Sequence, residues 1–197
     1  VPQNKAYRWD ETNGLQTYLD PSGYTAYAPN KKKSGGNGLI LDPEGNLLIA
    51  QHGDRRIAKM KAPLESKSPF TTVVDSFDGN RFHSPNDLIL SKNGDLYFTD
   101  PPYGLDGDDD PLRELDFNGV YRYSSEGKTA LLYSDLNRPN GLAFSKDESI
   151  LYVANSDPQR NLWMAFDLDN GRLSNERVFF DATHIKRPGL ADGMKVH

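Results

Sequence analysis

An Asn or Asp residue in front of a short apolar run recurs along this chain about every 50 residues. The four copies read Asn37-Gly-Leu-Ile-Leu, Asn86-Asp-Leu-Ile-Leu, Asn140-Gly-Leu-Ala-Phe and Asp192-Gly-Met-Lys-Val. Amide and carboxylate oxygens are the ligands that a hard cation such as calcium prefers. If the fold brings these positions together, they predict a cation site.

The residues after each opening Asn predict the elements that position it. In the first three copies the apolar run is followed by a hairpin turn with Gly, Asn, Asp or Pro, and then by three more short strands. The predicted strands span residues 37–41, 46–50, 57–60 and 71–74; 88–90, 95–99, 120–123 and 129–133; and 142–144, 150–154, 162–166 and 177–180. Four antiparallel strands in each repeat are typical of one blade of a β-propeller. No apolar period of 3.6 residues occurs, so we expect an all-β protein with very little helix.

The two ends of the chain do not complete this pattern. Residues 5–9 and 15–19 read as the third and fourth strands of a blade, and the last copy reaches His197 within its first strand. We therefore expect a single β-propeller domain over residues 1–197, about four blades of a longer propeller that is truncated at both ends. The alternative is a four-bladed ring in which the C-terminal strand joins the N-terminal pair.

Composition narrows the function class. The net charge of −5 argues against a nucleic-acid partner, whose binding domains usually carry a basic face. The absence of cysteine excludes disulfides, thiolate metal sites and a thiol nucleophile. No apolar run approaches the roughly 18 residues of a membrane helix, so we expect a soluble protein with no membrane partner. Localisation in the cytoplasm, in the periplasm or outside the cell stays open, as does the oligomeric state.

The opening residues of the copies are the leading site candidates. Equivalent positions in a propeller are related by rotation about its axis, so residues that begin the innermost strands line the central channel. We expect Asn86, Asn140 and Asp192 to bind the cation there, and Asn37 to line the same channel. Asn-Gly and Asp-Gly are also common turn pairs, which is the competing interpretation. Each of the first three copies, however, has a separate hairpin turn several residues later.

Several longer phrases resemble one protein family. They are Ser84-Pro85-Asn86-Asp87-Leu88, Tyr97-Phe98-Thr99-Asp100-Pro101-Pro102-Tyr103-Gly104, Arg138-Pro139-Asn140-Gly141-Leu142 and Leu190-Ala191-Asp192-Gly193-Met194. Together they resemble the gluconolactonase/regucalcin family, also called the senescence marker protein family. The phrase Gln51-His52-Gly53-Asp54-Arg55-Arg56 is similar to that of the gluconolactonase branch.

The resemblance implies a six-bladed parent propeller that holds one divalent cation at its axis and opens sugar lactones. Asn140 and Asp192 would be direct ligands, and Asn86 a ligand or the holder of a water or substrate oxygen. Calcium is the expected cation, with zinc or magnesium as alternatives. The family's remaining ligand, a Glu in a Glu-Gly-Pro phrase, has no counterpart in this sequence.

The chemistry implied is metal-assisted hydrolysis, in which the cation polarises the lactone carbonyl and activates a water. Asp192, the acidic member of the set, would be the catalytic base. Asn37, His52, His83 and Tyr103 are candidates for lining the substrate pocket. A hydrogen-bonded structural role is the competing interpretation for His52.

Two other functions are compatible with the sequence. The same cation could polarise a phosphorus–oxygen bond, which would make the protein a phosphotriesterase-like hydrolase. A non-catalytic propeller that binds calcium, a sugar or a partner protein is an alternative of a different class. The three retained oxygen ligands argue against the non-catalytic alternative, whereas the sequence separates the two hydrolases poorly. The family resemblance implies a lactonase acting on a small-molecule sugar lactone.

Overall fold

Runs of aliphatic and aromatic residues between turn residues form the β-strands, which lie between residues 6 and 181. The computed structural model describes residues 3–30 and 32–196. It divides into unit 1, comprising Val1–Pro85 and Pro102–Leu115, and unit 2, comprising Asn86–Pro101 and Asp116–His197. A single domain over residues 1–197 stays a prediction.

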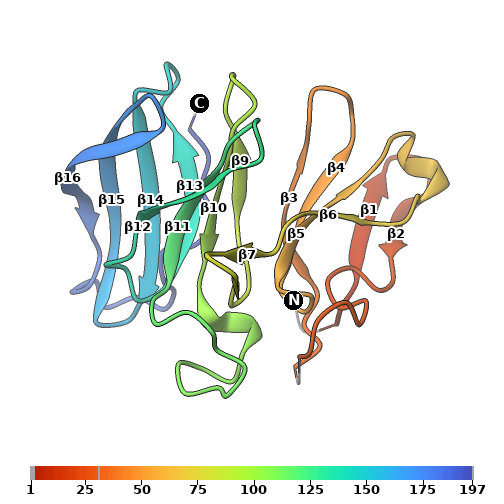
Figure 1. Ribbon diagram of the computed structural model, residues 1–197, viewed down its shortest axis with the longest axis horizontal. Helices are drawn as coiled ribbons and strands as arrows, with labels where there is room; N and C mark the ends of the chain where they lie inside the picture. Colours follow the sequence, from red (N-terminus) through yellow and green to blue (C-terminus); the bar gives the residue numbers. More distant parts are fainter. Residues whose placement is uncertain (1–2, 31, 197) are drawn as a thin grey trace. The chain divides into compact units, whose positions relative to one another are not determined.

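Unit 1 contains a four-stranded antiparallel sheet in the order β3-β4-β5-β6 (Figure 1). These strands span Gly36–Leu41, Leu47–Gln51, Arg56–Met60 and Thr71–Val74. In the turn between β3 and β4, the Gly45 N–H donates to the Asp42 carbonyl over 2.9 Å. The φ of Gly45 is +79°, a conformation that glycine adopts without steric penalty. One core cluster of this unit consists of buried apolar side chains, namely Leu19, Leu47, Ile49, Ala58 and Met60.

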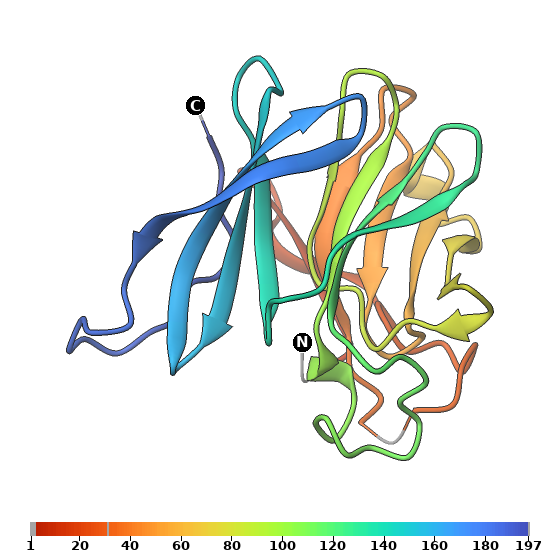
Figure 2. The same cartoon turned by 60° about the vertical axis from the view of Figure 1, so that its left-hand side comes forward.

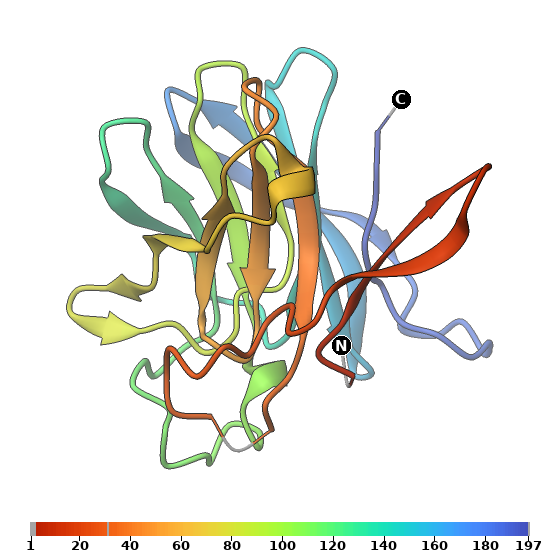
Figure 3. The same ribbon diagram turned by 90° about the vertical axis from the view of Figure 1, so that its right-hand side faces the viewer.

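Two smaller hairpins complete the strands of unit 1. β1 (Ala6–Asp10) pairs with β2 (Gly14–Leu19) in a two-stranded sheet, and Figure 3 shows this hairpin extending away from the larger sheet. β7 (Ser76–Phe77) pairs with β8 (Asn80–Arg81). This second hairpin is absent from the strands predicted above, although Asp-Gly is a strong hairpin signal in sequence. Its turn residues Asp78 and Gly79 both have positive φ.

Helix is confined to two single turns among the described residues. These are the 3-10 turns η1 (Leu64–Ser66) and η2 (Pro102–Gly104). The prediction of very little helix is therefore confirmed for the part of the chain that the structure describes. No helix there is long and apolar enough to cross a membrane.

Unit 2 contains two four-stranded antiparallel sheets (Figure 2). The first has the order β12-β11-β10-β9, with strands β9 (Leu88–Leu90), β10 (Leu96–Asp100), β11 (Gly119–Tyr123) and β12 (Thr129–Tyr133). The second has the order β13-β14-β15-β16, with strands Pro139–Phe144, Ile150–Asp157, Arg160–Asp169 and Arg172–Asp181. Both sheets share one core, in which Ile89 and Val120 of the first belong to the same cluster as Leu142 and Val153 of the second.

The predicted strands agree with the observed ones except at the last copy. Each of the three complete repeats forms a four-stranded sheet, and β15 and β16 are longer than predicted, with 10 residues each. The expected strand after Asp192 is wrong, because residues 192–196 have no strand conformation. A strand requires a neighbour to complete its hydrogen-bond ladder, and within the described chain no strand pairs with these residues.

In the first sheet of unit 2, an ion pair joins Arg122 of β11 to Asp95, the buried residue just before β10. The guanidinium of Arg122 donates to Asp95 Oδ2 from both Nε and Nη2 over 2.6 Å. Asp95 Oδ1 accepts the Ser125 N–H over 2.9 Å. Burial raises the pKa of Asp95, but the Ser125 N–H and the Arg122 guanidinium outweigh it and hold this pKa below its usual value. The charged carboxylate is therefore the form that the fold stabilises.

We expect the substitution Asp95→Asn to lower the free energy of unfolding at pH 7 by about 1–3 kcal/mol, because it removes charge-assisted hydrogen bonds. The folded-state pKa lies below the unfolded value of about 3.9, so this contribution is present above that value and is lost as the pH falls through the folded pKa. Guanidinium unfolding curves at pH 7 and pH 3 should show the deficit shrinking in acid. A deficit of equal size at both pH values would contradict this account.

Candidate functional site

Asn86 lies in unit 2, two residues before β9. Its side chain is 2% exposed. Its main-chain N–H donates to the Thr99 carbonyl of β10 over 2.8 Å, and the Thr99 N–H donates to the Asp87 carbonyl over 3.1 Å. These bonds continue the β9–β10 pairing backwards from β9. They fix the backbone from which the Asn86 side chain projects.

Asn140 is the second residue of β13, in the other sheet of unit 2. Its side chain is buried and receives a hydrogen bond at Oδ1 from Asn86 Nδ2 over 2.7 Å. Its main-chain carbonyl accepts a bond from the Thr99 hydroxyl, also over 2.7 Å. Thr99 therefore binds the main chains of both asparagines. The structure brings these two predicted ligands into direct contact.

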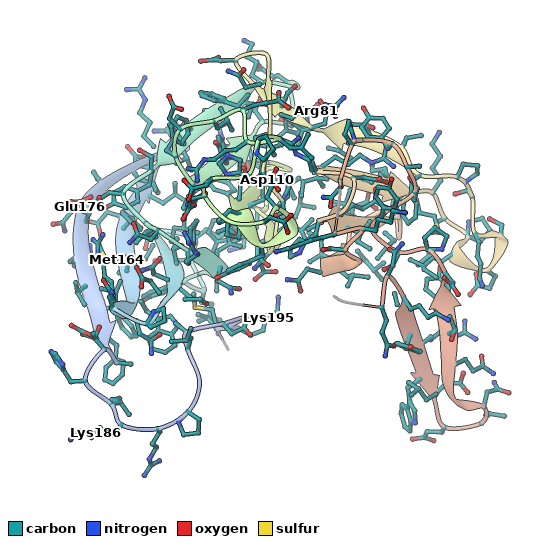
Figure 4. The ribbon with its side chains drawn as sticks, turned by 90° about the horizontal axis from the view of Figure 1, so that it is seen from below. Arg81, Asp110, Met164, Glu176, Lys186 and Lys195 are labelled. Atoms are coloured by element: carbon teal, nitrogen blue, oxygen red, sulfur yellow. The ribbon has the colours of Figure 1, made fainter. Side chains whose placement is uncertain are left out.

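Asp192 belongs to the segment that follows β16. Figure 4 shows Lys186 on the wide loop after that strand and Lys195 on the segment beyond it. The Asp192 side chain is exposed, and its Oδ1 accepts the N–H of Gly193 over 2.9 Å. Its main chain lies against Gly141, where an added Cβ would be only 2.4 Å from the Asp192 carbonyl oxygen. The backbone of Asp192 is thus packed beside Asn140, while its carboxylate faces solvent.

Asp87 is an acidic residue next to Asn86 and Asn140. It was not among the site residues predicted from the sequence. Burial raises the pKa of Asp87, although N–H donors from Leu88 and Leu142 and the positive charge of Lys195 act in the opposite direction. The negative charge of Asp192 raises it further. The Leu142 bond links the residue after Asn86 to the strand that carries Asn140, over 3.3 Å. Asp192 and Lys195 therefore lie close enough to influence this carboxyl electrostatically.

The donor groups limit the kind of cation that this place could hold. Among the described residues there is no group of three or more His, Cys, Asp or Glu side chains suited to a metal ion. A cation would have to rest on the amide oxygens of Asn86 and Asn140, with Asp192 as the carboxylate beside them. An oxygen-only set of this kind suits calcium or magnesium, whereas zinc is more often bound through His or Cys. The residues therefore fit a hard cation in chemical type.

Asn37 and His52, two of the predicted pocket residues, meet in unit 1. Asn37 falls within β3 and is exposed, and its Nδ2 lies 3.5 Å from Nε2 of the buried His52. This is a polar pair that could bind a hydroxyl group. Its part in substrate binding stays a prediction.

His83 and Tyr103, the other two pocket candidates, also belong to unit 1. His83 is fully buried, and its Nε2 lies 3.0 Å from the Leu115 carbonyl. Tyr103 is half-buried in η2, where its main-chain carbonyl accepts a bond from Lys32 Nζ over 3.4 Å. Both contacts hold the main chain in place. The role of either side chain at a pocket stays a prediction.

Two residues in the predicted motifs have a clearer structural role than the sequence analysis gave them. Thr99 and Asp87 both stand in the phrases that carry the family resemblance, and both connect the strands that present the asparagines. Their positions in these motifs were the only sign in the sequence that Thr99 and Asp87 matter. The motifs do not indicate their hydrogen-bond partners, because those partners lie in another strand, β13.

The chain matches a family model described as the SMP-30/gluconolactonase/LRE-like region, over residues 1–197. It is 39% identical to a gluconolactonase of Zymomonas mobilis over 204 aligned residues, which cover 99% of this chain and 56% of that protein. It also resembles the solved structure of a gluconolactonase from Xanthomonas campestris, with a TM-score of 0.80 and 30% identity. That match covers 99% of this chain and 60% of the other.

A calcium-binding regucalcin from Agrobacterium tumefaciens shares the fold, with a TM-score of 0.68 and 20% identity over 98% of this chain. These likenesses confirm the predicted fold class, an all-β propeller. The chain spans little more than half the length of the relatives with which it aligns.

The close approach at Gly141 gives a direct test of how Asp192 is held. We expect the substitution Gly141→Ala to displace residues 191–193, because the new methyl group would meet main-chain atoms of Asp192 and Gly193 at 2.4 and 2.7 Å. Overpacking of this kind costs about 1–3 kcal/mol. Hydrogen exchange of the Ala191 amide, which is bonded to Asn161 Oδ1 over 2.7 Å, should therefore become faster.

Gly193→Ala is the matched control, because no atom lies within 4 Å of its added Cβ. Exchange at Ala191 should be unchanged in that variant. Equal effects of the two substitutions would show that residue 141 does not hold this segment.

Proposed function

Because the chain belongs to the SMP-30/gluconolactonase/LRE-like family, we propose that the protein hydrolyses sugar lactones. The observation that carries this proposal is 39% identity with a gluconolactonase along 99% of the chain. The buried contact between Asn86 and Asn140, with Asp192 packed next to it, supports it further. These are the residues that the family motifs single out.

The reaction is the opening of a cyclic ester by one water molecule. The water oxygen forms a bond to the carbonyl carbon, and the bond between that carbon and the ring oxygen breaks. The ring oxygen takes a proton and becomes a hydroxyl group of the open-chain sugar acid. The protein must therefore remove a proton from water and neutralise negative charge on the carbonyl oxygen.

A divalent cation, calcium first and magnesium or zinc as alternatives, would supply positive charge for both tasks when bound. Asn86 and Asn140 would hold it through amide oxygens, and Asp192 through its carboxylate. Asp192 is also our candidate for the general base, because its carboxylate is exposed where water can reach it. The amides would orient the cation without neutralising it, since they carry no charge.

The test is hydrolysis of D-glucono-1,5-lactone by the full-length protein and by the variant Asp192→Asn. We expect kcat/KM to fall by at least about 100-fold, because a positioned base contributes roughly 100- to 10,000-fold. Asp109→Asn, a substitution of the same type at an exposed residue, should leave the rate unchanged. Chelation should abolish hydrolysis, and added calcium should restore it.

Other results would contradict parts of this proposal or favour a different function. Hydrolysis that survives chelation would remove the cation from the proposal, and a fully active Asp192→Asn variant would remove Asp192 as the base. Turnover of a phosphotriester in place of the lactone would favour the phosphotriesterase alternative. Calcium binding without turnover of either substrate would favour a binding protein.

A further inference from the structure

Ser156 lies near the end of β14 and contacts both parts of the candidate site. Its hydroxyl oxygen accepts a hydrogen bond from Asn140 Nδ2 over 2.9 Å. The same hydroxyl donates to the carbonyl of Ala191, the residue before Asp192. One side chain therefore connects a predicted amide ligand to the segment that carries the predicted carboxylate. Ser156 belongs to none of the motifs selected from the sequence.

These hydrogen bonds run in one direction. A main-chain carbonyl can only accept, so the single proton of the Ser156 hydroxyl is used on Ala191. The oxygen of Ser156 must then act as an acceptor toward Asn140, which requires the amide nitrogen to face it. Asn140 Oδ1 consequently faces the opposite way, where it accepts from Asn86 Nδ2. The three hydrogen bonds therefore form a series in which Asn86 donates to Asn140, Asn140 donates to Ser156, and Ser156 donates to Ala191.

Ala191 is held at both ends of its backbone. Its carbonyl accepts from Ser156, and its N–H donates to Asn161 Oδ1 over 2.7 Å. Ser156 and Asn161 are directly opposite each other in the pairing of β14 with β15. A cross-strand pair of side chains thus forms hydrogen bonds with both main-chain polar groups of the residue before Asp192. These bonds hold the segment in place although it is not a strand.

We propose that Ser156 is a positioning residue, which turns the oxygen of the Asn140 amide toward Asn86 and the cation site and fixes the segment that carries Asp192. The proposal rests on the proposed function in taking Asn140 and Asp192 as the groups that act. Loss of the hydroxyl would leave the Asn140 nitrogen without its acceptor. The amide could then rotate by half a turn and present its NH2 group where an oxygen is needed.

The test compares Ser156→Ala, which removes the hydroxyl, with Ser156→Thr, which retains one. Ser174→Ala in exposed β16 is the matched control. In Ser156→Ala we expect shifted and faster-exchanging NMR signals for the Asn140 side-chain amide, and faster exchange at the Ala191 N–H. Calcium affinity and kcat/KM for glucono-1,5-lactone should fall by about 10- to 100-fold, the usual effect of losing a group that orients a ligand. Ser156→Thr should recover most of this loss.

The amide signals distinguish positioning from general destabilisation. Weaker calcium binding in Ser156→Ala with unchanged Asn140 signals would overturn the proposal, as would full affinity and activity in that variant. If the unsubstituted protein neither binds calcium nor opens the lactone, the proposed function fails. The role of Ser156 then depends on the Asn140 signals alone, and unchanged signals would disprove it. If Ser156→Ala does not fold, the Asn140 side-chain amide is measured in the unsubstituted protein. Slow exchange there would support its hydrogen bond to Ser156, and exchange as fast as that of an exposed amide would overturn the proposal.

Discussion

A hydrogen bond between two buried amide side chains is the constraint on which unit 2 depends. Asn86 precedes β9, the first strand along the chain of one four-stranded sheet, and Asn140 lies in β13, the first strand of the other. Thr99 adds a bond to the main chain of each. Two repeats that are far apart in sequence are thereby joined at equivalent positions, through polar groups as well as through their shared apolar core.

Such a contact fixes the arrangement of the sheets because the alternatives are unfavourable. A buried amide or carbonyl without a partner loses about 1–3 kcal/mol, whereas the net gain from a satisfied hydrogen bond is nearer 1 kcal/mol. A shift of β13 by one residue would move Asn140 to the opposite face of its sheet and leave Asn86 and Thr99 without these partners. Apolar side chains tolerate some adjustment, but directional donors and acceptors do not. The polar groups therefore specify the register that the apolar core stabilises.

The sequence predicted what depends on local pattern and repetition, and missed what depends on particular neighbours. Alternating apolar runs and turn residues were sufficient for the twelve strands of the three complete repeats, and the repeat itself placed Asn86 next to Asn140. The strand expected after Asp192 is absent because no strand of the described chain pairs with residues 192–196. Ala191, the residue before Asp192, is held instead by side chains of β14 and β15. Ser156 could not be selected in advance, because a serine near the end of a strand has no distinctive signal. Its importance arises only when Asn140 and Ala191 are both within reach.

The distribution of charge in this cluster also has a physical reason. Asp87 is already a half-buried carboxyl whose pKa is raised, first by burial and also by the nearby Asp192. Acidic residues at the buried positions 86 and 140 would add more negative charge beside Asp87, at a high desolvation cost. Amides provide oxygen ligands without that charge. They also donate hydrogen bonds, as Asn86 does to Asn140 and Asn140 does to Ser156. The acidic candidate ligand is Asp192, which is exposed to solvent. If a divalent cation binds as we propose, it would keep most of its charge for the substrate, because only one of its three protein ligands is anionic.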